Sequence, residues 1–190
     1  MRLRDKVAII TGGGTGIGHA TAILLAGEGA TVMIAGVKQQ TIEETAAAIT
    51  SEGGRASCIT TDVSKADAVE RMVKATISAY GKIDILSNNA AVFVGATKSI
   101  RDLSEDEWDS LMAVNLKGVF LCCKYVIPEM IRKVVGRSSI VLPSQDTSAS
   151  ARWALTMQQR EVWSCSANVW LLISLSTKPE STQSALAGWR

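Results

Sequence analysis

The segment at residues 11–18, Thr-Gly-Gly-Gly-Thr-Gly-Ile-Gly, constrains the fold of this chain more than any other. It follows the apolar run 6–10, which predicts a buried strand, and precedes residues 19–29, whose apolar side chains recur at helical spacing. Strand, glycine-rich turn and helix in this order are typical of a site for a nucleotide diphosphate, whose phosphates meet free N–H groups at the helix start. An ordinary strand-to-helix turn is the alternative interpretation.

Three glycines of this turn have separate expected roles. Gly12 permits the tight turn, Gly16 lets the backbone approach a pyrophosphate, and Gly18 lets the helix pack closely against the strand. The spacing is G-x-x-x-G-x-G, not the G-x-G-x-x-G of many dinucleotide folds. Because the helix dipole contributes only about 0.3–1 kcal/mol per exposed charge, we expect geometry to contribute more affinity than charge.

Composition and charge exclude several classes of protein. A chain of 190 residues has the length of one domain, and its net charge of +2 does not suggest a nucleic-acid or membrane-surface partner. We expect no transmembrane segment, because no apolar run reaches the length that spans a bilayer. The four cysteines lack the spacing of zinc ligands, so we predict no metal site. Cys122 and Cys123 are interpreted as small core residues of a protein from a reduced, cytoplasmic compartment.

Apolar and amphipathic segments alternate over the first three quarters of the chain. Predicted strands cover residues 6–10, 31–36, 55–60 and 83–87 and begin again at 139, and predicted helices cover 19–29, 40–52, 65–80 and 109–133. This alternation predicts an α/β fold, a Rossmann-like doubly wound parallel sheet with helices on both faces. Ligands of such sheets bind beyond the carboxyl ends of the strands, where residues 11–18, Gly36, Asp62 and Asn89 all fall.

Four motifs in this order give the chain a family resemblance. They are Thr11–Gly18, Asp62-Val63, Asn88-Asn89-Ala90-Ala91 and Val114-Asn115-Leu116-Lys117-Gly118. Residues 1–141 resemble the short-chain dehydrogenase/reductase family, with Ala91 in place of the usual glycine. The resemblance implies a dinucleotide-binding Rossmann domain and a set of cofactor-binding residues: Thr11, Gly12, Thr15, Gly16, Ile17, Gly18, Lys38, Asp62, Val63, Asn89 and Ala90.

The end of the second predicted strand bears on the choice of cofactor. Members of the family that prefer NAD place an acidic residue there to bind the ribose 2′-OH, whereas this chain has Gly36. Removing the carboxylate removes repulsion toward a 2′-phosphate, and the nearby Lys38 could pair with that phosphate. We therefore expect NADP in preference to NAD, with a solvated loop lysine as the alternative role for Lys38.

The family resemblance also implies catalytic residues that this sequence does not contain. Family members transfer hydride between the nicotinamide and a ketone or alcohol, with a tyrosine as proton donor or acceptor and a lysine four positions later that lowers the pKa of the tyrosine. Asn115 is present, but Tyr80 is followed by Asp84 and Tyr125 by Glu129. We expect both tyrosines to serve packing.

The serine that orients the substrate in this family is also displaced. Ser144 is the candidate, but it lies one position before the expected place, and a shift of one residue on a strand turns a side chain to the opposite face. Catalysis by the chain as printed is therefore expected to be weak or absent.

Beyond residue 141 the composition changes, as a different C-terminal domain, a splice alternative or a shift of the reading frame would produce, and the codon table tests the last of these. Of fifteen glycines only Gly188 lies beyond Gly136, whereas four of the five tryptophans do. Reading the third base of each codon with the first two of the next, from Leu155 to Arg190, permits a continuation that begins Y-N-A-T-K-G-G-V-V-L-L-S and contains N-A-V-C-P-G-W. That string holds the missing Tyr-x-x-x-Lys. We therefore predict that a base was gained or lost between about Val141 and Ser150, and that residues 142–190 are an aberrant tail.

These interpretations carry structural and functional consequences. Without the family's sixth strand we expect the fifth to be an exposed sheet edge, and oligomerisation through the missing catalytic helix is doubtful, although the family forms homo-oligomers. The alternative to an impaired oxidoreductase is a non-catalytic dinucleotide-binding module, or a partner of intact relatives. A methyltransferase on a similar sheet is disfavoured, since Asn88-Asn89 and Val114-Asn115 have no role there. His19, the only histidine, is interpreted as a helix-surface residue.

Overall fold

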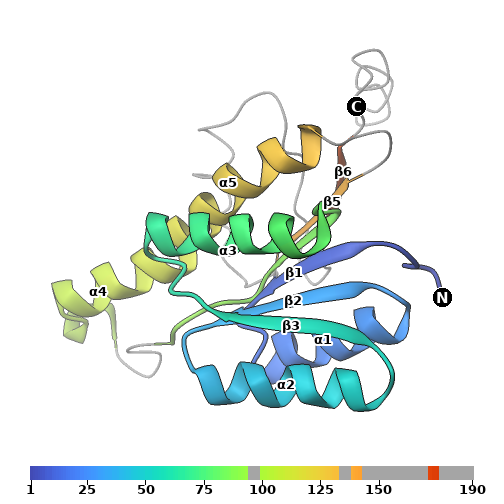
Figure 1. Cartoon of the computed structure of the whole chain (residues 1–190). Coiled ribbons are helices and arrows are strands. Elements are labelled where there is room, and N and C mark those ends of the chain that lie inside the picture. The colour runs from blue at the N-terminus through green and yellow to red at the C-terminus, as the bar shows by residue number, and fades with distance from the viewer. Residues whose placement is uncertain (94–98, 133–137, 143–170, 176–190) are drawn as a thin grey trace, which may run out of the picture.

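In the part of the chain that the structure describes, six strands form one sheet (Figure 1). The computed structural model describes residues 1–93, 99–132, 138–142 and 171–175. The strands are β1 (Val7–Thr11), β2 (Thr31–Gly36), β3 (Arg55–Thr60), β4 (Ile85–Asn88), β5 (Ser138–Leu142) and β6 (Leu171–Leu175). Their order is β3-β2-β1-β4-β5-β6, and each of β1 to β5 is parallel to its neighbours among these five. The predicted Rossmann-like α/β sheet is therefore confirmed.

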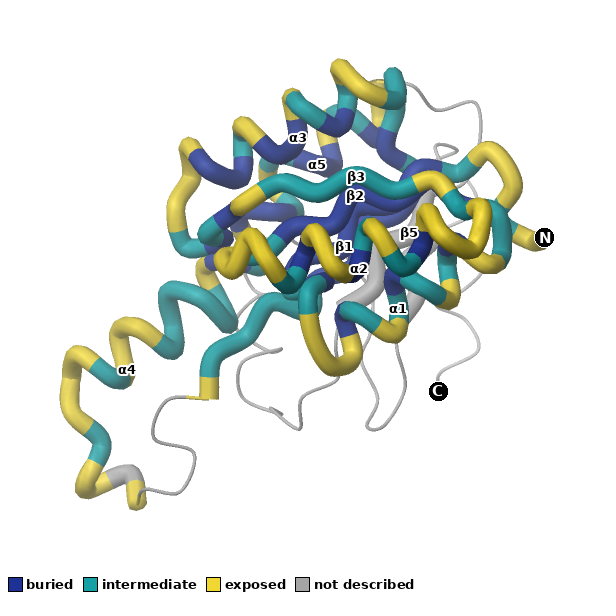
Figure 2. Tube along the Cα trace, turned by 60° about the horizontal axis from the view of Figure 1, so that its bottom comes forward, coloured by how far each residue is buried: buried dark blue, intermediate teal, exposed yellow. Residues whose placement is uncertain are grey.

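Helices cover both faces of the sheet. They are α1 (Gly16–Gly27), α2 (Gln39–Ser51), α3 (Ala66–Tyr80), the 3₁₀ turn η1 (Ile100–Asp102), α4 (Glu105–Met112), the π-helical segment η2 (Ala113–Gly118) and α5 (Val119–Arg132). The helices α1 and α2 pack on one face, and α3 and α5 pack on the other (Figures 1 and 2). Figure 2 also shows α4 projecting away from the sheet, with many exposed residues.

The central strand β1 shows why the sequence forms two cores. Successive side chains of a strand point to opposite faces, so Ile9 joins the core beneath α3 and α5, while Ile10 joins the core beneath α1 and α2. All five residues of β1 are buried. A strand that is buried on both faces has an unbroken apolar sequence instead of an alternating one, as the run 6–10 does.

Helix ends follow local signals in the sequence. Gly81 ends α3 in the left-handed conformation, with φ +77°, which glycine adopts without steric cost. Ser104 and Glu107 form a capping box at the start of α4. The predicted helix 109–133 begins earlier, at Glu105, and contains the π-helical segment η2, which the sequence pattern did not predict.

The predicted exposed edge at β5 is wrong. Residues Leu171–Leu175 form β6 and pair antiparallel with β5, with Leu142 opposite Leu171 and Ser138 opposite Leu175. The physical reason is that an open strand edge offers unpaired N–H and C=O groups to any apolar extended segment within reach. A five-residue run of Leu-Leu-Ile-Ser-Leu meets that condition without belonging to a strand–helix alternation.

The expectation that no segment reaches transmembrane length also needs correction. Within the described residues, the continuous helix Glu105–Arg132 is long and apolar enough to span a membrane, with a mean hydropathy of 1.5 over its most apolar window. Here, however, the α5 part of this helix packs on the sheet and on α3 through a buried stripe that includes Leu121, Val126 and Met130. A core helix passes the same test of length and composition, so the finding is weak evidence for a membrane span.

Candidate functional site

The glycine turn lies at the carboxyl end of β1. This strand has β2 on one side and β4 on the other, so the order of the strands along the chain reverses here. Gly12 adopts φ +63°, and a Cβ on it would lie 2.7 Å from the backbone nitrogen of Ala90. A Cβ on Gly18 would lie 2.2 Å from the carbonyl oxygen of Gly12. Side chains at either position would therefore collide with backbone, and the turn can be this tight only with glycine at both. Gly18 is expected to let the helix pack closely on the strand, whereas the backbone that it approaches in the structure is that of the turn residue Gly12.

Hydrogen bonds to the end of β4 hold this turn in place. The buried hydroxyl oxygen of Thr11 accepts from the backbone N–H groups of Asn89, at 3.1 Å, and Ala90, at 3.3 Å. The side-chain amide of Asn89 donates to the carbonyl and hydroxyl oxygens of Ser87. On the other side, the N–H of Gly13 donates to the carbonyl of Ala35 at the end of β2. The predicted residues Thr11, Gly12, Asn89 and Ala90 thus lie together at the carboxyl ends of β1 and β4.

The start of α1 offers free backbone donors to a ligand. Within residues 1–93, Thr15 makes no side-chain capping hydrogen bond to α1, and the first helical turn carries no acidic residue. Gly16 has φ +54° with open space on its side-chain face, and Ile17 is 62% exposed. An uncapped helix N-terminus beside a glycine cradle suits an anionic phosphate.

Two buried oxygens add to the fit with a polar ligand. The side-chain oxygens of Asn88 and Asn89 are buried, and within the described part of the chain neither has a hydrogen-bond partner. A buried acceptor without a partner costs about 1–3 kcal/mol, so such atoms are expected where a ligand or water completes the site. The residues at the end of β4 therefore fit a bound group with hydrogen-bond donors.

The end of β2 disfavours a large side chain at position 36. A Cβ on Gly36 would lie 2.9 Å from the Cγ2 atom of Ile42, a core residue of α2. An acidic residue at this position would therefore force Ile42 to move. Lys38 lies two residues further on, as the exposed N-cap of α2 in an extended conformation.

Asp62 and Val63 follow β3 and differ in their surroundings. One carboxylate oxygen of Asp62 accepts from both the N–H and the hydroxyl of Ser64, at 2.9 and 2.7 Å. Val63 is buried, and a Cβ on Gly118 would lie 2.7 Å from its Cγ2 atom. The side chain of Val63 therefore contacts the long helix, which leaves only its backbone to face a ligand.

Asn115 lies in the π-helical segment η2, and both polar atoms of its side chain are hydrogen-bonded. Its Oδ1 atom accepts from the backbone N–H of Val92 at 2.9 Å, and its Nδ2 atom donates to the carbonyl of Val92 at 3.0 Å. The Asn115 amide thus bonds both backbone groups of Val92, as a neighbouring strand would, and attaches the segment after β4 to the helix. Single-turn π segments recur at functional sites, which agrees with the predicted importance of this residue.

No tyrosine lies beside Asn115 in the way that the family relay would need. The hydroxyl of Tyr80 donates to the hydroxyl of Ser57 on β3, and both Tyr80 and Tyr125 pack against the core beneath α3 and α5. The expected packing role of the two tyrosines is confirmed. The candidate Ser144 lies outside the described residues.

Sequence reasoning missed three partners of the site. Ser64 could have been found, because Asp-x-Ser is the pattern of a turn closed by its own carboxylate. Val92 carried no signal, since it contributes only its backbone to Asn115. Thr45 on α2 carried no sequence signal either. The expectation that His19 lies on the helix surface is wrong, because His19 is half-buried and hydrogen-bonded to Thr45.

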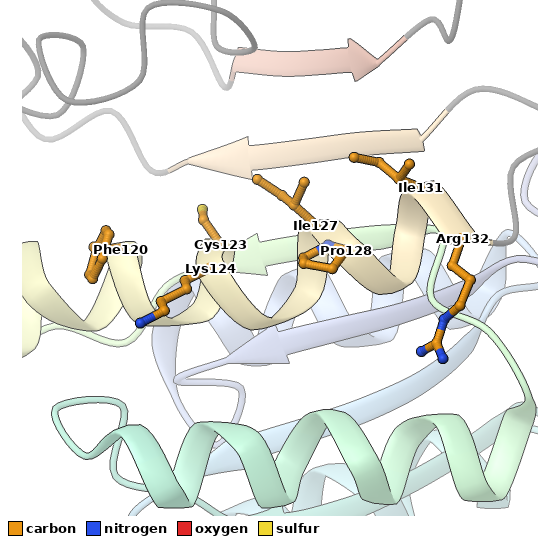
Figure 3. Close-up of a pocket in the computed structure, with 7 residues that line it drawn as sticks. All are labelled: Phe120, Cys123, Lys124, Ile127, Pro128, Ile131 and Arg132. Carbon is orange, nitrogen blue, oxygen red and sulfur yellow. The ribbon is translucent and has the colours of Figure 1, made fainter.

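A hollow of about 500 Å³ lies along α5 (Figure 3). It is lined by Phe120, Cys123, Lys124, Ile127, Pro128, Ile131 and Arg132. Ile127 and Ile131 point toward the neighbouring strand in Figure 3. None of these described lining residues belongs to the predicted cofactor set, so this hollow and the crevice at the turn are separate features.

The two adjacent cysteines of α5 are unsuited to nucleophilic or metal chemistry. Burial raises the pKa of the Cys122 thiol to about 12 and that of Cys123 to about 11, so both stay protonated near neutral pH. Across residues 1–93 and 99–132, no three histidine, cysteine or acidic side chains gather as a metal site would require.

Comparison with known proteins gives one consistent result. A family model described as short chain dehydrogenase matches residues 6–148. The short chain dehydrogenase/reductase astE of Aspergillus oryzae is 45% identical over 143 residues, which cover 75% of this chain and 54% of that protein. The oxidoreductase YxbG of Bacillus subtilis is 44% identical over 130 residues, or 68% of this chain and 47% of its own.

Solved structures agree with these relatives. The citronellol catabolism dehydrogenase AtuB of Pseudomonas aeruginosa superposes with a TM-score of 0.71 at 32% identity, covering 78% of this chain and 59% of its own. The chain spans about half the length of the curated relatives it matches.

Proposed function

Because the chain belongs to the short-chain dehydrogenase/reductase family, we propose that it binds a nicotinamide dinucleotide in the crevice formed by the glycine turn and the end of β4. The observation that carries this proposal is the approach of Gly12 to Ala90, where even a Cβ would lie 2.7 Å from backbone nitrogen. This tight turn leads into the uncapped start of α1, whose backbone N–H groups would face a pyrophosphate.

The proposed contacts divide the dinucleotide between neighbouring elements. The start of α1, from Thr15 to Gly18, would hold the pyrophosphate, and Asp62 and Val63 would flank the adenine side. Asn89 and Ala90 would lie beside the ribose toward the nicotinamide. The bound nicotinamide would supply the hydride acceptor or donor.

We further propose NADP(H) in preference to NAD(H). The clash of a side chain at position 36 with Ile42 supports this choice, because it disfavours the carboxylate that would bind a free 2′-OH. Lys38 stands exposed at the start of α2, where a 2′-phosphate would meet both its ammonium group and the first N–H groups of the helix.

The family reaction is hydride transfer between the nicotinamide and a ketone or alcohol, and we propose that this chain performs it poorly or not at all. It has no tyrosine followed four residues later by lysine. Asn115 holds Val92 with both polar atoms of its side chain, so its own contribution is to position the segment after β4. Without the tyrosine, no group of the family relay can deliver a proton to a substrate oxygen.

The proposed reason for this loss lies in the reading frame. The family match extends over residues 6–148, and its end falls inside the interval from Val141 to Ser150 where we place the shift. The shifted frame from Leu155 permits Tyr-Asn-Ala-Thr-Lys. Resequencing the locus on an independent clone is the test, and an uninterrupted frame that encodes the printed tail would overturn this proposal.

A second candidate function is a dinucleotide-binding module without catalysis, or a partner of intact relatives. The completeness of the described cradle, against the missing Tyr-x-x-x-Lys pair, favours it for the chain as printed. For either function we propose a reduced, cytoplasmic setting without a nucleic-acid or membrane partner. The buried packing of α5 supports the latter point. Homo-oligomerisation through the catalytic helix of the family is not proposed for the printed chain, because its Tyr-x-x-x-Lys segment is absent.

Calorimetric titration with NADPH and NADH, combined with a turnover assay on simple ketones and alcohols, tests the proposed function. We expect saturable binding of NADPH, weaker binding of NADH, and no turnover. Absence of binding to both nucleotides by the folded chain would overturn the proposal. Turnover would instead overturn the claim of impaired catalysis.

A further inference from the structure

One hydrogen bond joins the two helices that flank the proposed cofactor crevice. The Nδ1 atom of His19 on α1 lies 2.9 Å from the hydroxyl oxygen of Thr45 on α2. The Thr45 hydroxyl donates its single proton to the carbonyl of Thr41, also at 2.9 Å. The oxygen of Thr45 must therefore accept from His19, which places a proton on Nδ1 of the imidazole.

The environment makes this bond difficult to lose. Thr45 is 0% exposed, whereas His19 is half-buried. Removing the imidazole would leave the buried Thr45 oxygen without its donor, which costs more than an exposed hydrogen bond would. Thr50 on the same helix makes the same bond to the residue four positions earlier but is exposed, so it offers a matched comparison.

The bond leads directly to the residue that we assign to the 2′-phosphate. Thr45 donates to Thr41, and the hydroxyl of Thr41 donates to the carbonyl of Lys38 at 3.0 Å. A Cβ on Gly14 would lie 2.3 Å from the hydroxyl oxygen of Thr41, so the first turn of α2 packs on the glycine turn without a gap. These hydrogen bonds, linked through the residue Thr41, form a series from α1 to the backbone carbonyl of Lys38.

The first turn of α2 depends on this series because its own cap is weak. Lys38 is the N-cap and makes no side-chain capping hydrogen bond among the described residues. Serine, threonine, asparagine and aspartate are the residues that stabilise this position, and lysine does not. The placement of Lys38 therefore relies on Thr41, Thr45 and the packing against Gly14.

We propose that His19 and Thr45 are positioning residues that fix Lys38 relative to the glycine turn and thereby set the preference for NADP over NAD. This inference rests on the proposed function. Pyrophosphate contacts come from α1 and the turn itself, so they are expected to survive the loss of the bond. Recognition of the 2′-phosphate requires two elements, the turn and the start of α2, at a fixed separation.

Nucleotide affinity in matched variants tests the proposal. Dissociation constants for NADPH and NADH are measured by calorimetry for the full chain and for Thr45→Val, His19→Leu and the double variant. We expect each single variant to weaken NADPH binding by at most about 2- to 5-fold while NADH changes less than about 2-fold, because the effect acts through the single exposed charge of Lys38. The double variant should lose no more than the larger single loss.

Two controls separate positioning from a general loss of stability. Thr45→Ser keeps the hydroxyl and should restore the wild-type ratio of NADPH to NADH affinity, and Thr50→Val should leave it unchanged. Amide hydrogen exchange of the chain without nucleotide gives an independent readout. Exchange at Ile42, whose N–H donates to the carbonyl of Lys38, should rise in Thr45→Val and His19→Leu but not in Thr50→Val.

The outcomes distinguish this inference from the function on which it rests. If the wild-type chain binds neither nucleotide, the proposed function fails and the inference fails with it. If wild type binds NADPH but the folded variants keep the wild-type ratio, only the inference is overturned. Should Thr45→Val not fold, His19→Leu decides, since His19 is only half-buried.

Discussion

The two sides of the crevice are built to different degrees. On the side of the glycine turn, Thr11, Gly12 and Gly13 contact both neighbouring strands through named backbone and hydroxyl bonds. On the side of η2, Asn115 spends both polar atoms on Val92, and no tyrosine stands beside it among the described residues. Under the proposed function, the first side has the contacts expected of a binding surface, whereas the second has a scaffold without the reactive groups of the family.

This difference teaches how binding and catalysis depend on sequence. The cradle consists of short-range features, such as glycines, one hydroxyl and a helix start, within the first ninety residues. The proton relay of the family needs residues from a later segment, and the sequence beyond residue 141 does not supply them. A disturbance late in the chain can therefore remove the chemistry and leave the binding site intact.

Substitution of Gly12 should have the largest effect on this contrast. Gly12→Val should abolish NADPH binding, a loss of more than about 100-fold, because the new Cβ would meet Ala90 at 2.7 Å and φ is +63°. Calorimetry measures the loss, and circular dichroism checks the fold. The matched control is Gly27→Ala on α1, which has no atoms within 4 Å of a new Cβ. Gly27→Ala should keep wild-type affinity, and equal losses in both variants would contradict the cradle.

Removal of the Asn115 side chain should affect the other side of the crevice alone. Asn115→Ala should lower the free energy of unfolding by about 1–3 kcal/mol, because the backbone N–H and C=O of Val92 lose their partners. Urea unfolding measures this change. NADPH affinity should change less than about 3-fold, because no pyrophosphate contact is proposed for Asn115. Stability equal to wild type would show that the Asn115–Val92 pairing is dispensable.

A smaller effect is expected at the start of α2. Lys38→Ala should weaken NADPH about 2- to 5-fold and leave NADH unchanged, since one exposed ion pair contributes about 0.2–1 kcal/mol. Lys65, the exposed N-cap of α3, provides the control as Lys65→Ala. Raising the salt concentration should shrink the difference between the two nucleotides. A parallel loss for NADH would argue against a role for Lys38 at the 2′-phosphate.

The pH dependence of stability tests the packing of α5 rather than the crevice itself. Burial raises the pKa of Cys122 to about 12 and that of Cys123 to about 11, from the usual 9.0. Because the folded pKa values lie above the unfolded ones, the stabilisation is complete below about pH 9 and declines as the pH rises toward 11. Urea midpoints at about pH 8 and about pH 10.5 measure this decline. The double variant Cys122→Ala/Cys123→Ala should show a shallower decline, and an unchanged slope would contradict the assignment.

Much of the binding side could be predicted because its signals are local. The bounds of β2 and β3, the glycine after α3 and the capping box at Ser104 all follow from neighbouring residues. The turn residues were likewise predicted from glycine spacing, and the structure places Gly12 and Gly18 in backbone contacts that only glycine permits.

What sequence could not predict depends on contacts between distant segments. The π-helical segment around Asn115 carries no spacing signal, because its clearest stabilising contact is a backbone group more than twenty residues away. The pairing of β6 with β5 required knowledge that the edge was within reach of residues 171–175. The His19–Thr45 bond joins two helices that follow β1 and β2, and the pairing of these strands sets the separation of the helices.

The central claim is that a competent NADP(H) cradle has lost its proton relay, and one experiment addresses both parts. The same preparation of the 190-residue chain is titrated with NADPH while ketone reduction is followed at saturating nucleotide. We predict single-site saturable binding with no consumption of NADPH above that of a protein-free sample. Sustained, protein-dependent reduction of any ketone, or a folded chain to which NADPH does not bind, would contradict it.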